Sequence, residues 1–369
     1  MKSQIPDFRR IVVKVGSNVI TKSDGNLDTL RISRLVEEIF VLYKKGIEVI
    51  LISSGAVAAG RNEVTPSKKT NVIAAKQVWA AIGQVKLISS YQYLFGKYGI
   101  TAGQVLATKE SFRDRLHYLN MRGCISAMLE NKVLPIVNEN DTISVNELMF
   151  TDNDELSGLI CSLMDCDSLF ILTNVDGIYN GTPGSPDSEI IREIDSDSEH
   201  ISKFIAPSGS SLGRGGMMTK YSTARKLADD GINVFIANGT RDTIISSIIN
   251  GKEVPFTRFI ANCEKKTGVK KWISNSGAFA RGSVTVNSGA REALLGDKAS
   301  SLLMIGITSV EGYFRKGDII TILDENGTAI GVGKSEFDSK KAEHSLQQKL
   351  RKPLIHYDYL VVNEKAGNS

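Results

Sequence analysis

The sequence predicts an α/β protein with a mostly parallel open sheet sandwiched between helices, followed by a small β-rich domain. Short apolar runs alternate with segments of helical periodicity up to about residue 255, which indicates a parallel sheet with both faces covered. Several of these runs end directly in glycine and polar residues. Beyond residue 255 short strands and turns dominate, and a chain of 369 residues usually forms more than one domain.

The elements of the first part follow from local signals. The apolar run 11–15 predicts a strand, and Asp28 is expected to cap the helix that comes next. Apolar residues recur with helical spacing until Gly46, which supplies a C-terminal stop. Further strands are expected at 47–53, 101–107, 133–137, 168–173 and 232–236, and further helices at 74–97, 117–131, 154–164 and 217–230.

The change in pattern also predicts the domain boundaries. We expect residues 1–257 to form the α/β domain, the basic stretch 258–275 to be a linker, and 276–369 to form the β-rich domain. Within the last of these, Asn326-Gly327 is the signature of a tight hairpin.

Composition narrows the class of protein. A net charge of +4 argues against a dedicated nucleic-acid binder, whose domain is usually strongly basic. The four cysteines form no CxxC pair and the four histidines do not cluster near them, so we expect buried or idle thiols, with no disulfide and no metal site. No apolar stretch approaches the ~20 residues of a membrane span, and no signal-peptide core is visible, so a soluble, cytoplasmic protein without membrane contact is expected.

Polar clusters follow the expected strands at their carboxyl ends. Each cluster alone could be an ordinary turn, because Asn, Asp, Gly and Ser mark turns generally. Together they favour a ligand site, since ligands of open parallel sheets bind beyond the carboxyl ends of the strands. The clusters are Lys14–Ser17, Ser53–Gly55, Asn138–Asp141, Thr151–Asp154 and Thr173–Gly177.

Two features of the sequence suit phosphoryl transfer, which needs positive charge on the migrating group and backbone amides around the phosphates. Lys14 lies inside an apolar run, where a solvated lysine is unexpected, although an exposed edge strand would also explain it. The glycine-rich stretch Leu212–Lys220 opens a helix, and helix N-termini bind anions. The stretch Gly331–Ser335 looks like the end of a Walker A loop, but Thr328 stands where its first glycine is required.

The motifs of the first part resemble the glutamate 5-kinases of the amino-acid kinase superfamily. They cover about residues 10–240 and run, in order, VVKVGSNVI, ISSGAVAAGR, AAKQVWAAIGQ, PIVNENDTIS, TDNDELSGL, ILTNVDGIY and GRGGMMTK. The C-terminal part resembles a PUA domain, through VTVNSGAREAL, ASSLLMIGITSVEGYFRKGD and GVGKSEFDS. Three positions depart from the usual pattern: Met304 replaces a proline, Asn174 often is Asp in relatives, and Arg214 often is Thr or Ala.

The resemblance implies a role for each matching residue. Lys14 and Lys220 would stabilise the transferring phosphoryl group, and Asp154 would hold both ammonium groups. The residues implied for glutamate binding are Ser54, Asp141 and Asn153. The residues implied for the site of ATP, with Mg²⁺ bridging its phosphates, are Lys14, Thr173, Asn174, Arg214, Gly215, Gly216, Met217, Met218, Thr219 and Lys220.

The implied reaction is transfer of a phosphoryl group from ATP to the γ-carboxylate of L-glutamate, the first step of proline synthesis. This carboxylate is already an anionic nucleophile, so no general base is required, and the polar clusters contain no histidine. The resemblance also implies feedback inhibition by proline and a homo-oligomer. The stretch between Asp141 and Asp154 carries apolar residues that could close over the site or pack on another subunit.

Two alternatives remain open from the sequence. One is another amino-acid kinase, acting on acetylglutamate, aspartate or a nucleoside monophosphate, which the order of the motifs disfavours. The other is an RNA-binding protein, because PUA folds often contact RNA.

Overall fold

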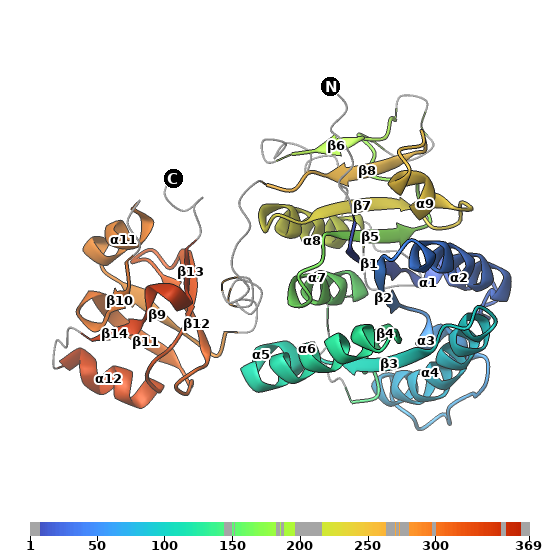
Figure 1. Ribbon diagram of the computed structural model, residues 1–369. Coiled ribbons are helices and arrows are strands. Elements are labelled where there is room, and N and C mark those ends of the chain that lie inside the picture. The colour runs from blue at the N-terminus through green and yellow to red at the C-terminus, as the bar shows by residue number, and fades with distance from the viewer. Residues whose placement is uncertain are drawn as a thin grey trace. The chain divides into compact units, whose positions relative to one another are not determined.

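The computed structural model describes residues 8–143, 150, 152–181, 185, 188–195, 216–262, 270, 273, 280–296, 300–347 and 352–362. The chain forms two compact units (Figure 1). The first comprises Met1–Lys109 and Leu119–Lys265, and the second comprises Glu110–Tyr118 and Lys266–Ser369.

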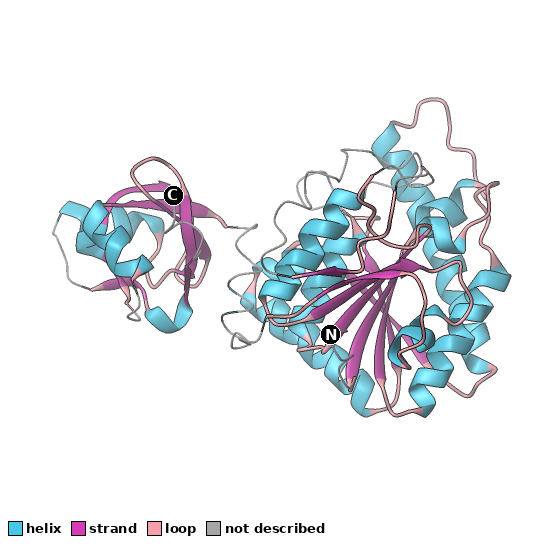
Figure 2. Ribbon diagram, turned by 90° about the horizontal axis from the view of Figure 1, so that it is seen from above, coloured by secondary structure: helices cyan, strands magenta, loops and turns pink. Residues whose placement is uncertain are grey.

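The first unit is built on an 8-stranded sheet with the order β3-β4-β2-β1-β5-β7-β8-β6. Neighbouring strands are parallel except β7 and β8, which are antiparallel. Helices cover both faces of the twisted sheet (Figure 2). The strands are β1 (Arg10–Val15), β2 (Glu48–Ser53), β3 (Ala102–Ala107), β4 (Leu134–Glu139), β5 (Ser168–Thr173), β6 (Glu193–Ile194), β7 (Asn233–Asn238) and β8 (Phe256–Phe259).

The helices of this unit begin and end where the sequence provides signals. The side chain of Asp28 accepts hydrogen bonds from two backbone N–H groups at the start of α2, and Gly46 adopts a φ of 78° just beyond its end, as expected. The helices are α1 (Ser17–Ile20), α2 (Thr29–Lys44), α3 (Ala56–Arg61), α4 (Val72–Gly96), α6 (Arg115–Glu130), α7 (Asn153–Leu163), α8 (Met217–Asp229) and α9 (Ile244–Ile249). The residues Glu110–Tyr118, which form α5 (Glu110–Arg113) and the start of α6, belong to the second unit.

The fold class and the expected strands and helices of this part are confirmed, with ends shifted by a residue or two. One assignment is wrong: Arg258 and Phe259, placed in the linker by their basic surroundings, belong to β8. The Arg258 guanidinium lies 5.8 Å from the centroid of the Phe235 ring and donates to Asn233 Oδ1 at 2.9 Å. A local pattern does not reveal this, because the partners that bury the arginine lie on β7.

Helices α3 and α4 cross with their backbones in contact. A Cβ atom at Gly83 would lie 1.8 Å from the carbonyl oxygen of Ala56, and one at Gly60 would lie 1.9 Å from that of Trp79. Glycine is therefore required at both positions, and this crossing fixes α4 beside the end of β2.

The second unit contains a 5-stranded sheet with the order β11-β9-β12-β13-β15, and a buried core of its own. The expected hairpin joins β12 to β13, with Gly327 at a φ of 80°. Residues 331–334 lie in strand β13, so the Walker-like stretch lacks the loop that binds phosphate. The elements of the C-terminal part of the chain are β9 (Gly282–Val286), α11 (Ser288–Leu295), β10 (Leu302–Leu303), η3 (Met304–Gly306), β11 (Ile307–Gly312), β12 (Ile319–Leu323), β13 (Ala329–Lys334), α12 (Ser339–Gln347), β14 (Pro353–Ile355), η4 (Tyr357–Tyr359) and β15 (Leu360–Val362).

Across the part of the chain that the structure describes, no helix has the length and apolar character to traverse a bilayer.

Candidate active site

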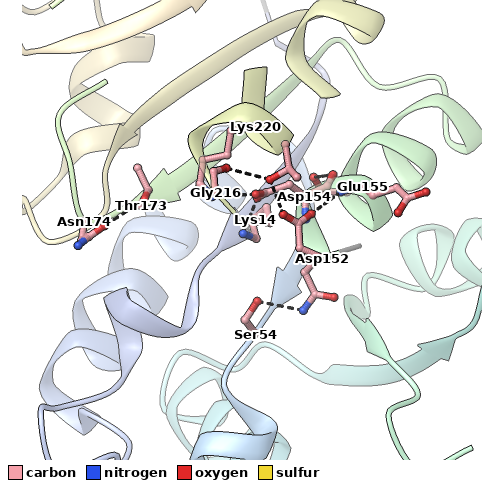
Figure 3. Close-up of polar contacts among 12 residues, drawn as sticks. Lys14, Ser54, Asp152, Asp154, Glu155, Thr173, Asn174, Gly216 and Lys220 are labelled. Atoms are coloured by element: carbon pink, nitrogen blue, oxygen red, sulfur yellow. Dashed lines mark hydrogen bonds and ion pairs between the residues drawn. The ribbon is translucent and has the colours of Figure 1, made fainter. Parts of the chain in front are cut away.

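Four of the predicted polar clusters meet at one edge of the sheet. Strands β4, β2, β1 and β5 are adjacent and parallel, so their carboxyl ends point the same way. The fifth cluster, which includes Asp152 and Asp154, begins α7. Asp152 and Asp154 lie beside the end of β1 (Figure 3).

The centre of this edge is a buried carboxylate between two lysines. Asp154 has no exposed surface, and Lys14 and Lys220 are only 4% and 8% exposed. Lys14 Nζ pairs with Asp154 Oδ1, and Lys220 Nζ lies 2.9 Å from Asp154 Oδ2 (Figure 3). Burial acts to raise the pKa of Asp154, but the two ammonium groups outweigh it and hold that pKa below its ordinary value. The exposed-edge explanation for Lys14 is therefore wrong.

Three different elements supply these groups, and the packing of two of them depends on a glycine. Lys14 comes from β1, Asp154 from the first turn of α7, and Lys220 from the first turn of α8. A Cβ atom at Gly158 would lie 2.9 Å from Thr223 Cγ2 of α8. A side chain at this position would have to displace the Thr223 methyl group, so glycine allows α7 and α8 to pack closely.

Asp152 ties the same two helices together, and sequence reasoning assigned it no role. Its Oδ1 accepts from the backbone N–H of Asp154 at 2.9 Å and of Glu155 at 3.1 Å, which caps α7. Its Oδ2 accepts from Thr219 Oγ1 of α8 at 2.6 Å. Burial, and then the charge of Asp154, raise the pKa of Asp152. The rule that Asp caps helices could have identified its bond to α7, but not its bond to α8.

The residues expected to bind glutamate lie on the β4–β2 side of the lysines. Asn153 Nδ2 donates to Ser54 Oγ at 3.0 Å and to Asn138 Oδ1 at 2.9 Å, so the structure brings Ser54 and Asn153 together. Asp141 follows the end of β4 at the same edge. Of the stretch between Asp141 and Asp154, residues 144–149 and 151 lie outside the described residues.

The residues expected to bind ATP lie on the β5 side. Thr173 ends β5, and its Oγ1 donates to Asn174 Oδ1 at 3.3 Å. Gly216 is the N-cap residue of α8, and it has no side chain that could accept from the first N–H groups of the helix, in the turn Met217–Lys220. Arg214 and Gly215 lie outside the described residues.

Gly16 keeps the approach to Lys14 open. Its backbone N–H donates to the carbonyl oxygen of Leu172 at 3.1 Å, and a Cβ atom here would lie 3.9 Å from Lys14 Nζ. The φ of −76° is accessible to any residue, so the backbone conformation does not require glycine here. What matters is that Gly16 has no side chain to occupy the space beside Lys14.

The arrangement presents two ammonium groups and an uncapped helix N-terminus to one region of the sheet edge. Such a site suits an anionic group that gains charge or moves between two oxygens. Among the described residues, no group of three or more His, Cys, Asp and Glu side chains could hold a metal ion.

Comparison with known proteins identifies related families and folds. The model of the amino acid kinase family matches residues 9–238, and that of the PUA domain matches residues 282–354. Two solved structures share the fold of the first unit. Carbamate kinase from Giardia lamblia bound to AMP-PNP is 18% identical, with a TM-score of 0.52, over 69% of this chain and 99% of that one. UMP kinase from Ureaplasma parvum is 13% identical, with a TM-score of 0.50, over 69% of this chain and 100% of that one.

Curated relatives match at much higher identity and over both units. Glutamate 5-kinase from Bacteroides thetaiotaomicron is 52% identical, covering 96% of this chain and 99% of its own. Glutamate 5-kinase from Chlorobaculum tepidum is 48% identical, covering 98% and 99%. The chain therefore belongs to the amino acid kinase family and, within it, to the glutamate 5-kinases that carry a PUA domain.

Proposed function

We propose that this glutamate 5-kinase transfers the γ-phosphoryl group of ATP to the γ-carboxylate of L-glutamate between Lys14 and Lys220. The observation that carries the proposal is the pairing of both ammonium groups with one fully buried carboxylate, Asp154. A buried pair of lysines is costly unless it is neutralised or meets an anion. One carboxylate balances one of the two charges, so a net positive charge faces the transferring group.

Asp154 acts in this proposal by position and not by proton transfer. Its lowered pKa keeps it ionised at neutral pH, and its two oxygens orient the two lysines. The γ-carboxylate attacks the γ-phosphorus directly while the bond from that phosphorus to the β,γ-bridging oxygen breaks and ADP leaves. The charge that spreads over the phosphoryl oxygens is stabilised by both ammonium groups. No group needs to remove a proton from the nucleophile.

The substrate sites lie on opposite sides of this centre. Glutamate would contact Ser54, Asn153 and Asp141, with the Asp141 carboxylate meeting the substrate's ammonium group. ATP would lie against Thr173 and Asn174, with its phosphates at the start of α8, from Arg214 to Lys220. The uncapped N–H groups after Gly216 support this placement of the phosphates.

Mg²⁺ would enter with ATP and neutralise its phosphates. The ion commonly keeps several waters and uses substrate phosphates as ligands instead of a protein cage. The oxygens of Asp154 are already engaged by two lysines, so we place the cation on the nucleotide and assign it no protein ligand.

A panel of acceptors tests the proposal. Purified protein with MgATP should consume ATP when L-glutamate is added, and not with L-aspartate, N-acetyl-L-glutamate or UMP. Turnover of UMP without turnover of glutamate would assign the chain to another branch of the family.

The proposal extends to regulation, assembly and location. Proline, an α-amino acid without a side-chain carboxylate, would inhibit by occupying the glutamate contacts. A homo-oligomer is supported by apolar side chains of α4 that remain exposed, Val85 at 65% and Tyr93 at 67%. We place the enzyme in the cytoplasm.

RNA binding by the PUA domain is a second candidate function, supported only by the family match of residues 282–354. Filter binding of structured RNA at increasing salt tests it, because electrostatic RNA contacts weaken steeply with salt.

A further inference from the structure

A chain of hydrogen-bonded side chains runs from α4 to the expected glutamate site. Gln84 Oε1 accepts from Asn138 Nδ2 at 2.7 Å, and Asn138 Oδ1 accepts from Asn153 Nδ2 at 2.9 Å. Asn153 Nδ2 also donates to Ser54 Oγ at 3.0 Å. We define these four residues, Gln84, Asn138, Asn153 and Ser54, as the amide relay.

A backbone group sets the direction of the relay. The backbone N–H of Glu139 can only donate, and it donates to Asn138 Oδ1 at 2.9 Å. This fixes which end of the Asn138 amide is oxygen, so its Nδ2 must find an acceptor, which Gln84 provides. Asn138 is only 2% exposed, so water does not readily replace that acceptor.

The direction of the relay leaves one atom without a partner. Asn153 Nδ2 is used twice, so Asn153 Oδ1 faces away from Asn138 and Ser54. This oxygen is buried, and among the residues that the structure describes it has no hydrogen-bond partner. An unsatisfied buried acceptor costs free energy unless a ligand supplies a donor.

We propose that Gln84 is a positioning residue for substrate selection: through Asn138 it holds Asn153 with its Oδ1 presented to the ammonium group of glutamate. The inference rests on the proposed function, because it assumes that glutamate binds beside Ser54 and Asn153. Gln84 touches no substrate and acts through Asn138 alone. Its effect falls on the recognition of an amino group, not on the phosphoryl transfer between the lysines.

Three variants of Gln84 distinguish a role in orienting the Asn153 amide from a role in packing α4. Gln84→Met keeps the size of the side chain but removes the acceptor, and Gln84→Ala removes it while favouring the helix. Gln84→Glu keeps an acceptor for Asn138 Nδ2. As a matched control, Gln92→Met removes a glutamine hydrogen bond from the same helix, the one to the carbonyl oxygen of Ala102 at the start of β3.

The decisive readout compares glutamate with glutarate, which has the same carbon chain and no amino group. The KM for glutamate and the Ki of glutarate as a competitive inhibitor are measured for each variant, with thermal unfolding as a check of folding. In Gln84→Met and Gln84→Ala, the KM for glutamate should rise about tenfold, the loss expected for a hydrogen bond to a charged group. The Ki of glutarate and the KM for ATP should not change, and Gln84→Glu and Gln92→Met should keep the wild-type selectivity.

Two results would overturn the inference in an active enzyme. One is an unchanged KM for glutamate in folded Gln84→Met or Gln84→Ala. The other is an equal loss of glutamate and glutarate binding, which would make Gln84 a packing residue. Failure of the wild-type protein to phosphorylate glutamate would instead refute the proposed function, and the inference with it.

Discussion

The ammonium group of Lys220 lies 2.9 Å from Oδ2 of Asp154, a carboxylate that has no exposed surface and whose other oxygen pairs with Lys14. The three residues come from β1, α7 and α8. This pairing places two cations where a phosphoryl group would pass.

Removing either lysine should reduce turnover with little effect on the KM for glutamate. A charge that acts on the moving phosphoryl group stabilises mainly the transition state, so kcat is expected to fall by about 100-fold or more in Lys14→Ala and in Lys220→Ala. Steady-state kinetics with glutamate and MgATP measure this effect. Lys86→Ala removes a lysine that is paired with Glu63 on the surface and serves as the control. If either buried lysine could be removed with more than about half of the turnover retained, the site would be misplaced.

The contributions of Asp152 and Asp154 to folding stability should change with pH in opposite directions. The pKa of Asp152 is raised in the folded state, so at a pH between the unfolded value of about 3.9 and the folded value the folded protein keeps a proton that the unfolded chain has lost. Folding stability therefore falls as the pH rises through this interval. The lowered pKa of Asp154 contributes stability above that unfolded value, and this contribution is lost as the pH falls through the folded pKa.

Asparagine at each position should separate these effects at pH 7. Asp152→Asn keeps an N-cap and is expected to leave the free energy of unfolding unchanged or raised. Asp154→Asn leaves two buried ammonium groups without a counter-charge and should lower that free energy by about 3 kcal/mol. Urea unfolding between pH 4 and 8 measures both, and equal losses in the two variants would contradict the assignment.

Asp141→Asn should weaken glutamate binding and leave the KM for ATP unchanged. The substitution removes the negative charge that would meet the substrate's ammonium group, and a hydrogen bond to a charged group contributes about 1.5–3 kcal/mol. Initial rates with each substrate varied in turn provide the measurement. Equal damage to both KM values would indicate that Asp141 only closes the turn after β4.

Proline inhibition should be competitive with glutamate. Proline can satisfy the contacts to an α-ammonium and an α-carboxylate but has no γ-carboxylate to accept a phosphoryl group. Raising glutamate at fixed proline should restore the full rate. Inhibition that glutamate cannot relieve would place proline at a separate site.

A chain truncated after Lys265 should remain a folded kinase. The described residues that form the lysine pair and the amide relay all precede that point, as does Asn262, whose backbone N–H donates to the carbonyl oxygen of Ala228 at 2.9 Å. Circular dichroism and ATP-dependent turnover check folding and activity. A truncated protein that folds but has no activity would give the C-terminal domain a catalytic role.

Much of the fold could be predicted because its signals are local. Apolar runs, the cap at Asp28 and the stop at Gly46 each act within a few residues, and the parallel order of the strands aligned their polar ends at one edge. The sequence does not predict strand β8, because Arg258 is buried by a neighbouring strand that the local sequence does not reveal.

The site was predictable to a lesser degree, because it depends on contacts between distant residues. The position of Lys14 inside a strand marked it as unusual, but only the resemblance to a family implied its pairing with Asp154. The bond between Asp152 and Thr219 and the direction of the amide relay follow from the packing of α7, α8 and α4, and no spacing in the sequence encodes them.

The most direct test of the central claim is the trapping of the product by hydroxylamine. An acyl phosphate reacts with hydroxylamine to give a hydroxamate, whereas a phosphate monoester or anhydride does not. With L-glutamate, MgATP and hydroxylamine, the wild-type protein should form γ-glutamyl hydroxamate at a rate that falls by about 100-fold in Lys14→Ala and Lys220→Ala. ATP consumption without hydroxamate, or hydroxamate formed as fast by the lysine variants, would contradict the account.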